Sequence, residues 1–415
     1  MRTLILITLF AAACSKPNPY YCPGNPDDNC LIDADINAPQ GCSTSAECTN
    51  GAKPICEPME KVCVACTDGI PGSCGGTTPV CTAAHVCTGC TLHAQCDSTV
   101  CLPSGACAET QEVAYVTPNG TDGNGCTKTS PCKTVAAALA LGRPTIKILG
   151  NIDEAVVVTT GTVQIFGEGG STLRRTTSQG PVFEARGNGT TVTLSDLIIR
   201  DASGATGHGI YVAPGEPVDL TLTHVYAINN AANGLNVQGG KLTLSRSVVS
   251  GNSGGGAVVA GLFSITNSLF VANGNGVSTT GGITLTPQTT TTVFKFNTVA
   301  DNFSSSSSAA VRGVNCTLPQ MAANTIVSGN AVSANCSFGY SLFDTGTTVT
   351  GSNIAGDPMF KNIDGLDPLA SDYFHIQPAS AAVDHADPVS TMSTDIDGEA
   401  RPQGNAPDIG ADELH

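Results

Sequence analysis

Apolar residues two positions apart recur along the middle of the chain. The pairs are Val163/Ile165, Val192/Leu194, Leu220/Leu222, Leu242/Leu244, Phe263/Ile265 and Phe294/Phe296. Alternation with a period of two predicts a β-strand with one buried face. Another apolar residue follows four positions later, at Ile198, Tyr226, Val248 and Leu269, and strands that open with glycine follow at Gly209, Gly234 and Gly256. Each repeat therefore predicts three short strands.

The spacing of these repeats indicates how the strands are connected. Leu194, Leu222, Leu244, Ile265 and Phe296 are separated by 28, 22, 21 and 31 residues. The spacing suits turns of about 22 residues, with loops inserted in the first and last intervals. A β-sandwich would not keep this register, because its strands alternate in direction and its connections do not recur at a fixed length. The pattern predicts an all-β fold, a parallel β-helix solenoid over residues 113–345.

Polar residues mark two corners of each predicted turn. The first corner column contains Asp196, His224, Arg246, Asn267, Asn297 and Asn324. The second contains Asn230, Asn252, Asn273, Asn302 and Asn330. Asn and Asp tolerate the left-handed backbone that such corners need, and His does so to a lesser degree. We expect the second column to form a ladder of amides that hydrogen-bond along the solenoid.

The repeats resemble those of right-handed parallel β-helix proteins of the pectin-lyase-like group, and residues 115–134 are similar to the start of many such domains. The resemblance implies a short helix at about residues 133–141 that caps the open end of the coil. It further implies that Cys126 and Cys132 clip the loop before this helix and that Cys316 and Cys336 clip the far end.

The C-terminal part of the chain carries a second resemblance. Its segments Asp357–Phe360, Phe374–Ser380, Asp395–Pro402 and Asp408–Glu413 are similar to the closing module called the choice-of-anchor Q domain. We therefore expect residues 346–415 to form an acidic closing module. In that family a C-terminal surface anchor often follows, and we expect the N-terminal lipid described below to serve in its place.

A small cysteine array precedes the solenoid at residues 42–107. Its units open at Cys42, Cys66 and Cys90 and contain four cysteines each. The segments between them have too few apolar residues for a core, so we expect disulfides, with connectivity left open because four cysteines allow three pairings. The alternative is zinc, since two CxxC pairs at 63–66 and 87–90 have ribbon-like spacing. Those pairs fall at the joins between units and leave the other cysteines unexplained, which favours disulfides.

The N-terminus predicts export. A charged start, a short apolar stretch and Ala11-Ala12-Ala13 form a signal peptide over residues 1–13. The site resembles the lipobox of bacterial lipoproteins, which implies a lipid on Cys14 and, with Ser15 next, an outer-membrane or cell-surface location. Ordinary cleavage and secretion is the alternative. Of 19 cysteines, lipidation of one leaves an even number. Residues 14–41 are rich in Pro, Asn and Asp and predict a tether with a candidate pair, Cys22 and Cys30.

Composition and charge narrow the choice of partners. Trp is absent and Gly numbers 47, which suits thin repeated strands with tight corners. Lys+Arg against Asp+Glu number 12 against 12 in residues 111–345 and 2 against 12 in residues 346–415. Nucleic acid is excluded as a partner, because phosphate binding needs clustered cations. The expected partners are a membrane, through the lipid, and a polysaccharide or another cell surface.

Catalysis is the open question. The resemblance implies that a polysaccharide lyase or glycoside hydrolase is the alternative to a non-catalytic protein for glycan binding, adhesion or surface structure. A lyase needs a base and a cation, and a hydrolase needs converging carboxylates. Asp196, His224 and Arg246 are the catalytic candidates, stacked about 4.8 Å apart at one corner. They are equally the residues that a corner requires, and the sequence favours the non-catalytic reading.

No cofactor is required by this reading, but the acidic tail offers hard oxygen ligands. Asp395, Asp397, Asp408 and Asp412, with Glu413, have loop spacings compatible with Ca²⁺ and do not match an EF-hand. Solvated surface is the alternative interpretation of these acids.

Overall fold

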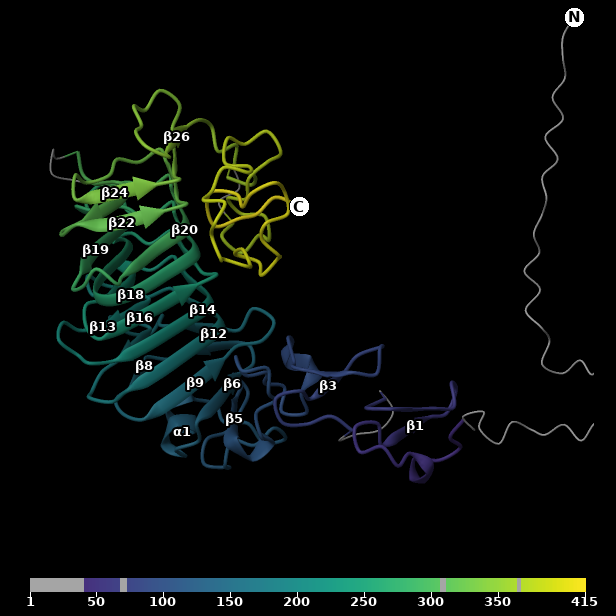
Figure 1. Ribbon diagram of the computed structural model, residues 1–415. Helices are drawn as coiled ribbons and strands as arrows, with labels where there is room; N and C mark the ends of the chain where they lie inside the picture. The colour runs from purple at the N-terminus through teal and green to yellow at the C-terminus, as the bar shows by residue number, and fades with distance from the viewer. Residues whose placement is uncertain (1–40, 68–72, 307–310, 364–366) are drawn as a thin grey trace, which may run out of the picture. The chain divides into compact units, whose positions relative to one another are not determined.

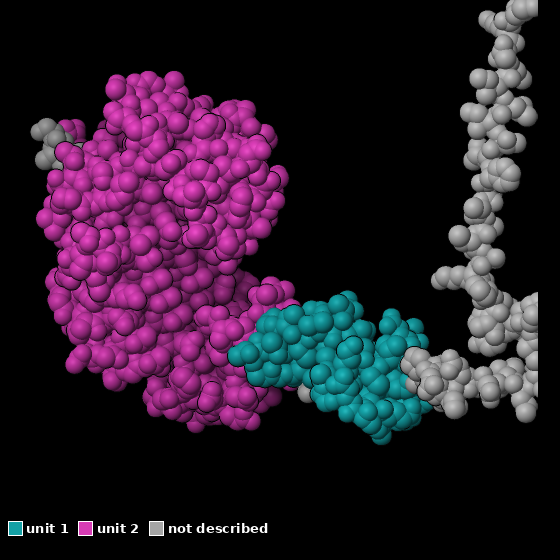
Figure 2. All heavy atoms as spheres, viewed as in Figure 1, with its two compact units in different colours: residues 1–89 teal, residues 90–415 magenta. Residues whose placement is uncertain are grey.

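The computed structural model describes residues 41–67, 73–306, 311–363 and 367–415. The predicted signal peptide, lipidation site Cys14 and pair Cys22 and Cys30 lie outside these residues. The chain divides into two compact units, residues 1–89 and residues 90–415, coloured separately in Figure 2. Among the described residues, no helix has the length and apolar character to cross a membrane.

The cysteine array is held by disulfides with one repeated connectivity. In each group of four, the first cysteine pairs with the third and the second with the fourth: Cys42–Cys56 and Cys48–Cys63, Cys66–Cys81 and Cys74–Cys87, Cys90–Cys101 and Cys96–Cys107. The predicted disulfides are therefore confirmed, and no thiolate of the array is left for zinc.

Little regular structure accompanies these disulfides. The described residues of the array, 42–67 and 73–107, contain two small antiparallel hairpins and two single 3₁₀ turns: β1 (Ile55–Glu57) with β2 (Val62–Val64), β3 (Val80–Cys81) with β4 (Cys87–Thr88), η1 (Ser45–Glu47) and η2 (His93–Gln95). The first two groups belong to the first unit and the third group belongs to the second unit. The third group thus belongs to the same compact unit as the solenoid, although the sequence repeat gives no sign of that difference.

The rest of the second unit is built on a parallel β-helix, as Figure 1 shows. Every strand pair from β5 to β26 is parallel, and the strands form three faces. The first face contains β5 (Val113–Val116), β6 (Thr145–Ile148), β9 (Thr162–Phe166), the first halves of β12 (Thr191–Arg200) and β14 (Asp219–Ile228), β16 (Lys241–Ser245), the middle of β18 (Gly255–Val271), the first half of β20 (Val293–Ala300), β22 (Gln320–Ala323) and β24 (Cys336–Gly339).

The other two faces are made of shorter strands. The second face contains β7 (Asn151–Asp153), β10 (Thr172–Arg174), β17 (Val248–Ser250), β23 (Ile326–Ser328), β25 (Leu342–Phe343), β26 (Ile354–Ala355) and the last parts of β12, β14, β18 and β20. The third contains β8 (Val156–Val158), β11 (Phe183–Ala185), β13 (Ile210–Val212), β15 (Asn233–Val237), the start of β18, β19 (Ile283–Pro287) and β21 (Val314–Cys316). The predicted all-β fold class and three-strand turn are confirmed.

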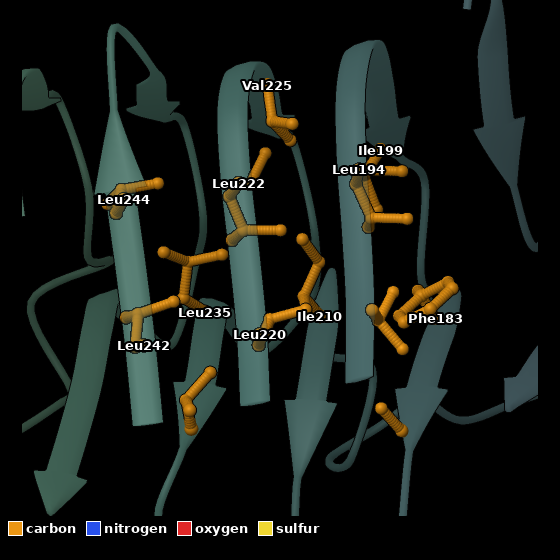
Figure 3. Close-up of a cluster of buried hydrophobic side chains, with 14 of the residues drawn as sticks. Phe183, Leu194, Ile199, Ile210, Leu220, Leu222, Val225, Leu235, Leu242 and Leu244 are labelled. Carbon is orange, nitrogen blue, oxygen red and sulfur yellow. The ribbon is translucent and has the colours of Figure 1, made fainter. Parts of the chain in front are cut away.

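Alternate apolar residues of each strand fill the interior of the coil. In Figure 3, Leu220 of the first face points toward Ile210 of the third face, and Leu242 points toward Leu235. All four belong to one continuous core and are at most 1% exposed. Because the pairing is in register, Leu194, Leu222, Leu244 and Ile265 stack as one interior column. Stacking of like aliphatic side chains explains how a sequence with so few aromatic residues forms a continuous core.

The predicted register is wrong by two residues in one turn. Ile265 pairs with Phe294, so the offset is 29 residues and not the 31 counted to Phe296. Phe296, with φ of 54°, occupies the corner, and Asn297 falls one position beyond it, where it is fully buried. Asn297 accepts a hydrogen bond from the Ser268 backbone amide at 3.1 Å. A second phenylalanine two positions along satisfied the alternation pattern equally well, so the pattern alone could not locate this corner.

The predicted amide ladder at the second corner is confirmed. Asn230, Asn252, Asn273 and Asn302 each donate an Nδ2 hydrogen bond to the Oδ1 of the next asparagine in the series, which ends at Asn330, over distances of 2.9 to 3.0 Å. Each of these Oδ1 atoms also accepts a hydrogen bond from the backbone amide of the preceding asparagine in the ladder. The ladder thereby supplies hydrogen-bond partners to a buried corner along four successive steps.

Both ends of the coil carry the predicted clips. The helix α1 (Val135–Ala140) follows the disulfide Cys126–Cys132, and the turn η3 (Thr110–Glu112) precedes β5. Thr134 caps α1 by accepting from the Ala137 amide, and Glu154 accepts from the two preceding helix amides. At the far end Cys316 pairs with Cys336.

The C-terminal segment, residues 356–415, packs against the outside of the second face. Tyr373, Phe374 and Ile396 form one cluster with Val248 and Leu269. A second cluster joins Ile376, Ala382 and Ile409 of the segment to Phe296, Ile326 and Leu342 of the coil. The apolar residues that follow the first corner in sequence therefore do not all point inward. Several point outward and are covered by the segment that Figure 1 shows in yellow beside the coil.

Candidate functional site

The first corner of the coil, between the first and second faces, holds the catalytic candidates. The backbone is left-handed at Asp196, His224 and Arg246, with φ of 59°, 54° and 53°. Because the same corner recurs on successive turns, these side chains leave the coil at one edge, and all three line one cavity. The structure thus brings the three candidates together, as the stacking argument predicted.

Asp196 lies between two histidines. His224 Nδ1 is 2.7 Å from Asp196 Oδ1, and His93 Nε2 is 3.3 Å from Asp196 Oδ2. The other ring nitrogen of His93 accepts a hydrogen bond from the Cys101 backbone amide at 3.0 Å. Since that nitrogen needs a lone pair, the proton of neutral His93 is on Nε2 and faces the carboxylate. One carboxylate therefore joins the third cysteine group to the solenoid.

A hydroxyl completes a short chain of polar groups. Tyr226 Oη is 3.3 Å from His224 Nε2, and His224 Nδ1 directs its proton toward Asp196. An aspartate that orients an imidazole is the arrangement by which a general base is held in one tautomer. The rings of His224 and Tyr226 meet edge to face, with centroids 5.4 Å apart. This series of hydrogen-bonded side chains ends at the Tyr226 phenol and includes no serine or cysteine nucleophile.

The charge states of Asp196 and Tyr226 follow from their surroundings. Burial opposes ionisation of Asp196, but hydrogen bonds and charge from His224 and His93 outweigh it and hold the pKa of this carboxyl well below its usual range. Burial raises the pKa of Tyr226, and the nearby carboxylate of Asp397 adds to the rise. At neutral pH the carboxylate is ionised and the phenol is protonated, so Tyr226 is a donor and not a base.

His93 was missed by the sequence analysis. It lies in the third cysteine group, far from Asp196 in the chain, and its ring also contacts Phe166 edge to face at 5.5 Å. Spacing arguments detect partners on neighbouring turns of a solenoid. They cannot detect a partner on a flanking loop whose fold is set by disulfides.

Arg246 is engaged by the C-terminal segment. Its Nε donates to the Ile396 carbonyl at 3.1 Å and its Nη2 donates to the Asp397 carbonyl at 2.7 Å. The next corner residue, Asn267, donates to the Thr394 carbonyl at 2.7 Å. The column therefore holds residues 394–397 in place, and the guanidinium that would neutralise a substrate carboxylate already binds two carbonyls.

Two cavities flank the corner. The larger, about 650 Å³, lies between the first face and the third cysteine group and is lined by Ser195, Thr223 and Arg246 together with the Asp196 and His224 side chains. Asp196 is the only carboxylate among the described residues that line it. The smaller, about 400 Å³, contains Tyr226 and Glu168, and Glu168 Oε2 is 3.3 Å from the buried Lys147 Nζ. Asp196 lines the smaller cavity as well, so two carboxylates meet there, but Glu168 is paired with Lys147 and Asp196 with two histidines. Glycoside hydrolysis uses a pair of converging carboxylates that is available to the substrate.

The remaining ionisable residues of these turns do not converge on the corner. Arg200 and Asp201 form an ion pair with each other, 3.1 Å apart, beyond the second-face strand. Asp219 is exposed at the start of β14. These residues therefore lie at other places on the coil and do not join Asp196, His224 and Arg246.

Most acids of the tail are used as acceptors for backbone amides. Asp395 accepts from the amides of Asp397, Glu399 and Glu413, at 3.0, 2.8 and 3.2 Å. Asp408 accepts from the amides of Asp384 and Leu414, at 2.6 and 2.8 Å. A carboxylate that already accepts two or three N–H groups is an anchor for an irregular chain, and its bound donors compete with a cation.

Two other tail acids approach a histidine. Asp397 Oδ2 is 3.3 Å from His375 Nε2, and Asp412 Oδ1 is 3.3 Å from His375 Nδ1. Burial raises the pKa of Asp412 to about 6, although His375 acts in the opposite direction. Burial raises the pKa of Asp397 as well. The four Ca²⁺ candidates thus divide into two backbone anchors and two residues that face an imidazole.

A buried arginine, Arg401, binds several groups of the C-terminal segment near these acids. Arg401 is 5% exposed, lies 3.3 Å from Glu413 and donates to the carbonyls of Asp408 and Ala411 at 2.7 and 3.0 Å. Its guanidinium also lies over the Phe296 ring, 4.6 Å from the centroid. Arg401 therefore joins the tail to the corner residue of the coil whose position was mispredicted.

Comparison with known proteins gives similarity in architecture only. No family model and no curated protein matches the chain. Pectate lyase Pel9A aligns with a TM-score of 0.44 and 15% identity, over 73% of this chain and 96% of its own. A mutant pectin methylesterase in complex with a hexasaccharide gives 0.37 and 14%, over 58% and 92%. Pectin methylesterase PemA from Erwinia chrysanthemi gives 0.32 and 14%, over 58% and 92%.

Proposed function

We propose that this protein is a β-helix displayed on a cell envelope by a lipid on Cys14, which binds glycan or another surface and has no catalytic centre. The observation that supports this proposal is that other groups of the protein already bind the corner side chains. Asp196 is bound by His224 and His93, and Arg246 is bound by two carbonyls of the C-terminal segment. The groups that a lyase would need are therefore already engaged within the protein.

The first face supports a binding role. Pairs of hydroxyl side chains face outward on four consecutive turns and are aligned by the strand register: Thr193 and Ser195, Thr221 and Thr223, Thr243 and Ser245, Ser264 and Thr266. Seven of these eight side chains are half-buried rather than fully covered. A regular array of donors and acceptors suits hydroxyl-rich ligands and needs no ionisable group. The larger cavity continues from this array, since Ser195 and Thr223 line it.

A binding experiment tests this surface. The chain from residue 15, without the lipid, is screened against immobilised acidic and neutral polysaccharides, and Thr221→Val with Thr243→Val removes two hydroxyls while keeping side-chain shape. Two lost hydrogen bonds correspond to roughly a tenfold weaker affinity. Thr129→Val, on an exposed loop, is the matched control. Binding that the double variant leaves unchanged would contradict the assignment of the first face.

The anchor is tested separately. Metabolic labelling with a radioactive fatty acid is expected to mark the wild type and not Cys14→Ser, and the label should fractionate with membranes. Secretion of unlabelled wild-type protein would contradict the lipid and favour ordinary cleavage at the same position.

One observation favours the alternative, a polysaccharide lyase or glycoside hydrolase. The Asp196 and His224 pair holds an imidazole as a general base would be held. Without a free cation for a lyase or a second carboxylate facing it in the larger cavity, the pair supports catalysis less well than it supports a fixed corner.

A further inference from the structure

Three side chains of the C-terminal segment converge at a point where the proposed glycan-binding role has no use for them. His375, Asp397 and Asp412 each offer one ligand atom, and the three atoms lie within 4.8 Å of one another. They come from separate parts of the segment, beside the aromatic residues that pack on the second face. The group is not only acidic, because an imidazole nitrogen is one of its members.

The two carboxylates approach opposite nitrogens of the His375 ring: Asp412 Oδ1 is 3.3 Å from Nδ1, and Asp397 Oδ2 is 3.3 Å from Nε2. In a tetrahedral zinc site with bonds of about 2.0 to 2.1 Å, neighbouring ligand atoms lie roughly 3.3 Å apart, which is the separation of Asp412 from Nδ1. Because an ion binds one ring nitrogen, the exposed Asp397 side chain must turn to reach an ion on Nδ1. Neither contact has the direction of a hydrogen bond, in contrast to the 2.7 Å bond from His224 to Asp196. The two carboxylates are therefore near the imidazole without being hydrogen-bonded to it.

Surrounding contacts hold two of the three groups in place. Asp412 Oδ2 accepts from the Ile376 amide at 2.8 Å, which leaves Oδ1 directed at His375. The backbone of Asp397 is fixed on both sides, since its amide donates to Asp395 and its carbonyl accepts from Arg246. Fixed supporting groups of this kind are what metal sites use to orient their ligands.

Accessibility also fits a site that an ion can enter. The side chains of His375 and Asp412 are 15% and 7% exposed, whereas that of Asp397 is 41% exposed. Asp397 is also the tail acid among the four Ca²⁺ candidates whose carboxylate takes no backbone amide within the described residues. Two ligands thus lie inside the segment and a third lies at the surface with its oxygens available.

We propose that His375, Asp397 and Asp412 bind a first-row divalent transition ion of the zinc type. One imidazole with two carboxylates suits Zn²⁺, whereas Ca²⁺ and Mg²⁺ take oxygen ligands almost exclusively. Three protein ligands leave a fourth position for water. Because Arg246 of the coil holds the Asp397 carbonyl, a bound ion ties the tail more firmly to the second face.

The test is a Zn²⁺ titration of the full mature chain, carrying no histidine tag, freed of metal by chelation and kept oxidised so that no cysteine thiol is available. Competition with a chromophoric chelator is expected to give one ion per chain and a rise in the thermal unfolding midpoint. Ca²⁺ at millimolar concentration should not compete. Failure to bind Zn²⁺ would overturn the proposal.

Variants locate the ion. His375→Ala and Asp397→Asn should each weaken Zn²⁺ binding by more than about a hundredfold, which exceeds the 10- to 100-fold cost of losing an outer-shell partner. Asp397 is partly exposed, so Asp397→Asn is expected to fold even where His375→Ala does not. His385→Gln, in the same segment, is the matched control and should bind as the wild type does.

A neighbouring group provides the competing result. Asp395, Glu399 and His415 also bring three ligand atoms within 4.8 Å. Binding that is lost in Glu399→Gln and retained in Asp397→Asn would place the ion there and overturn the proposal. Binding lost in Asp397→Asn and retained in Glu399→Gln supports it.

Discussion

The two polar corners of the coil use their side chains in different ways. First-corner residues such as Asp196 and His224 are themselves left-handed, whereas at the second corner the left-handed residue precedes each asparagine, at Asn229, Gly251, Ala272, Asp301 and Gly329. The expectation that the ladder asparagines adopt this backbone is therefore wrong. The second corner uses asparagine throughout, and each side-chain amide donates a hydrogen bond to the next. The amides of this column therefore find their hydrogen-bond partners within the column. The first corner varies between aspartate, histidine, arginine, asparagine and phenylalanine, and several of its side chains bind parts of the chain outside the coil. Uniform corners therefore stabilise the solenoid, whereas varied corners are where flanking segments attach.

The largest expected effect comes from breaking the ladder. Asn252→Ala removes bonds to the Ala227 carbonyl and to Asn273 and leaves Asn230 without its acceptor, all in a fully buried position. Unpaired buried groups of this kind cost about 3 kcal/mol in total. Asn267→Ala at the first corner loses the bond to the Thr394 carbonyl and should cost about 1 kcal/mol. Urea unfolding measures both, and equal losses would contradict the comparison.

Removing Arg246 should act locally. Arg246→Ala loses two bonds to the tail, so we expect amide hydrogen exchange in residues 394–398 to accelerate about tenfold, which corresponds to about 1.4 kcal/mol of local opening. Exchange in the ladder should not change. Lys241→Ala, exposed at the start of strand β16, which ends just before Arg246, is the control. Faster exchange throughout the coil would show that the corner residue stabilises the solenoid itself.

Asp196 makes a smaller, pH-dependent contribution. Its folded pKa is depressed, so the stabilisation is present above the unfolded value near 3.8 and is lost as pH falls through the folded pKa. Asp196→Asn should lower stability by about 1 kcal/mol at pH 7, a modest figure because the side chain is 39% exposed and screened by solvent. The difference should shrink only in strong acid. Asp201→Asn, also at a left-handed corner, is the control for the loss of one carboxylate charge.

The smallest effect is expected away from both corners. Burial lowers the pKa of His208 on the third face, where its ring stacks on Tyr211 at 5.3 Å. The folded state then favours neutral His208. The free energy of unfolding is therefore highest above the unfolded pKa of His208, near 6.5, and decreases as the pH falls below that value. His208→Gln should flatten the pH dependence between pH 7 and 5. An unchanged slope in chemical unfolding would contradict this assignment.

The sequence predicted those features that repeat at short range. The period-two alternation located the interior columns around Leu222, and the recurrence of Asn located the ladder at Asn252, because both patterns reflect one turn stacking on the next. The Cys126–Cys132 and Cys316–Cys336 pairs followed from the family resemblance. The corner at Phe296 was misplaced because two alternative phenylalanines fit the same alternation.

Contacts between distant segments could not be predicted. Nothing in the spacing of His93 or Arg401 indicates that one reaches Asp196 and the other lies over Phe296. The apolar residues at Val248 and Leu269 suggested a strand, but not that the tail would cover their outward side. The tail acids suggested Ca²⁺ because sequence gives their number and spacing. It does not give the backbone amides that Asp395 and Asp408 accept from.

The most direct test of the account is a turnover assay at the first corner. The purified chain is incubated with acidic and neutral polysaccharides, with and without Ca²⁺, and new unsaturated or reducing ends are followed over time. The account predicts no turnover by the wild type, because Asp196, His224 and Arg246 are engaged within the protein. Turnover that disappears in Asp196→Ala, His224→Ala or Arg246→Ala would contradict it and make the corner column a catalytic site.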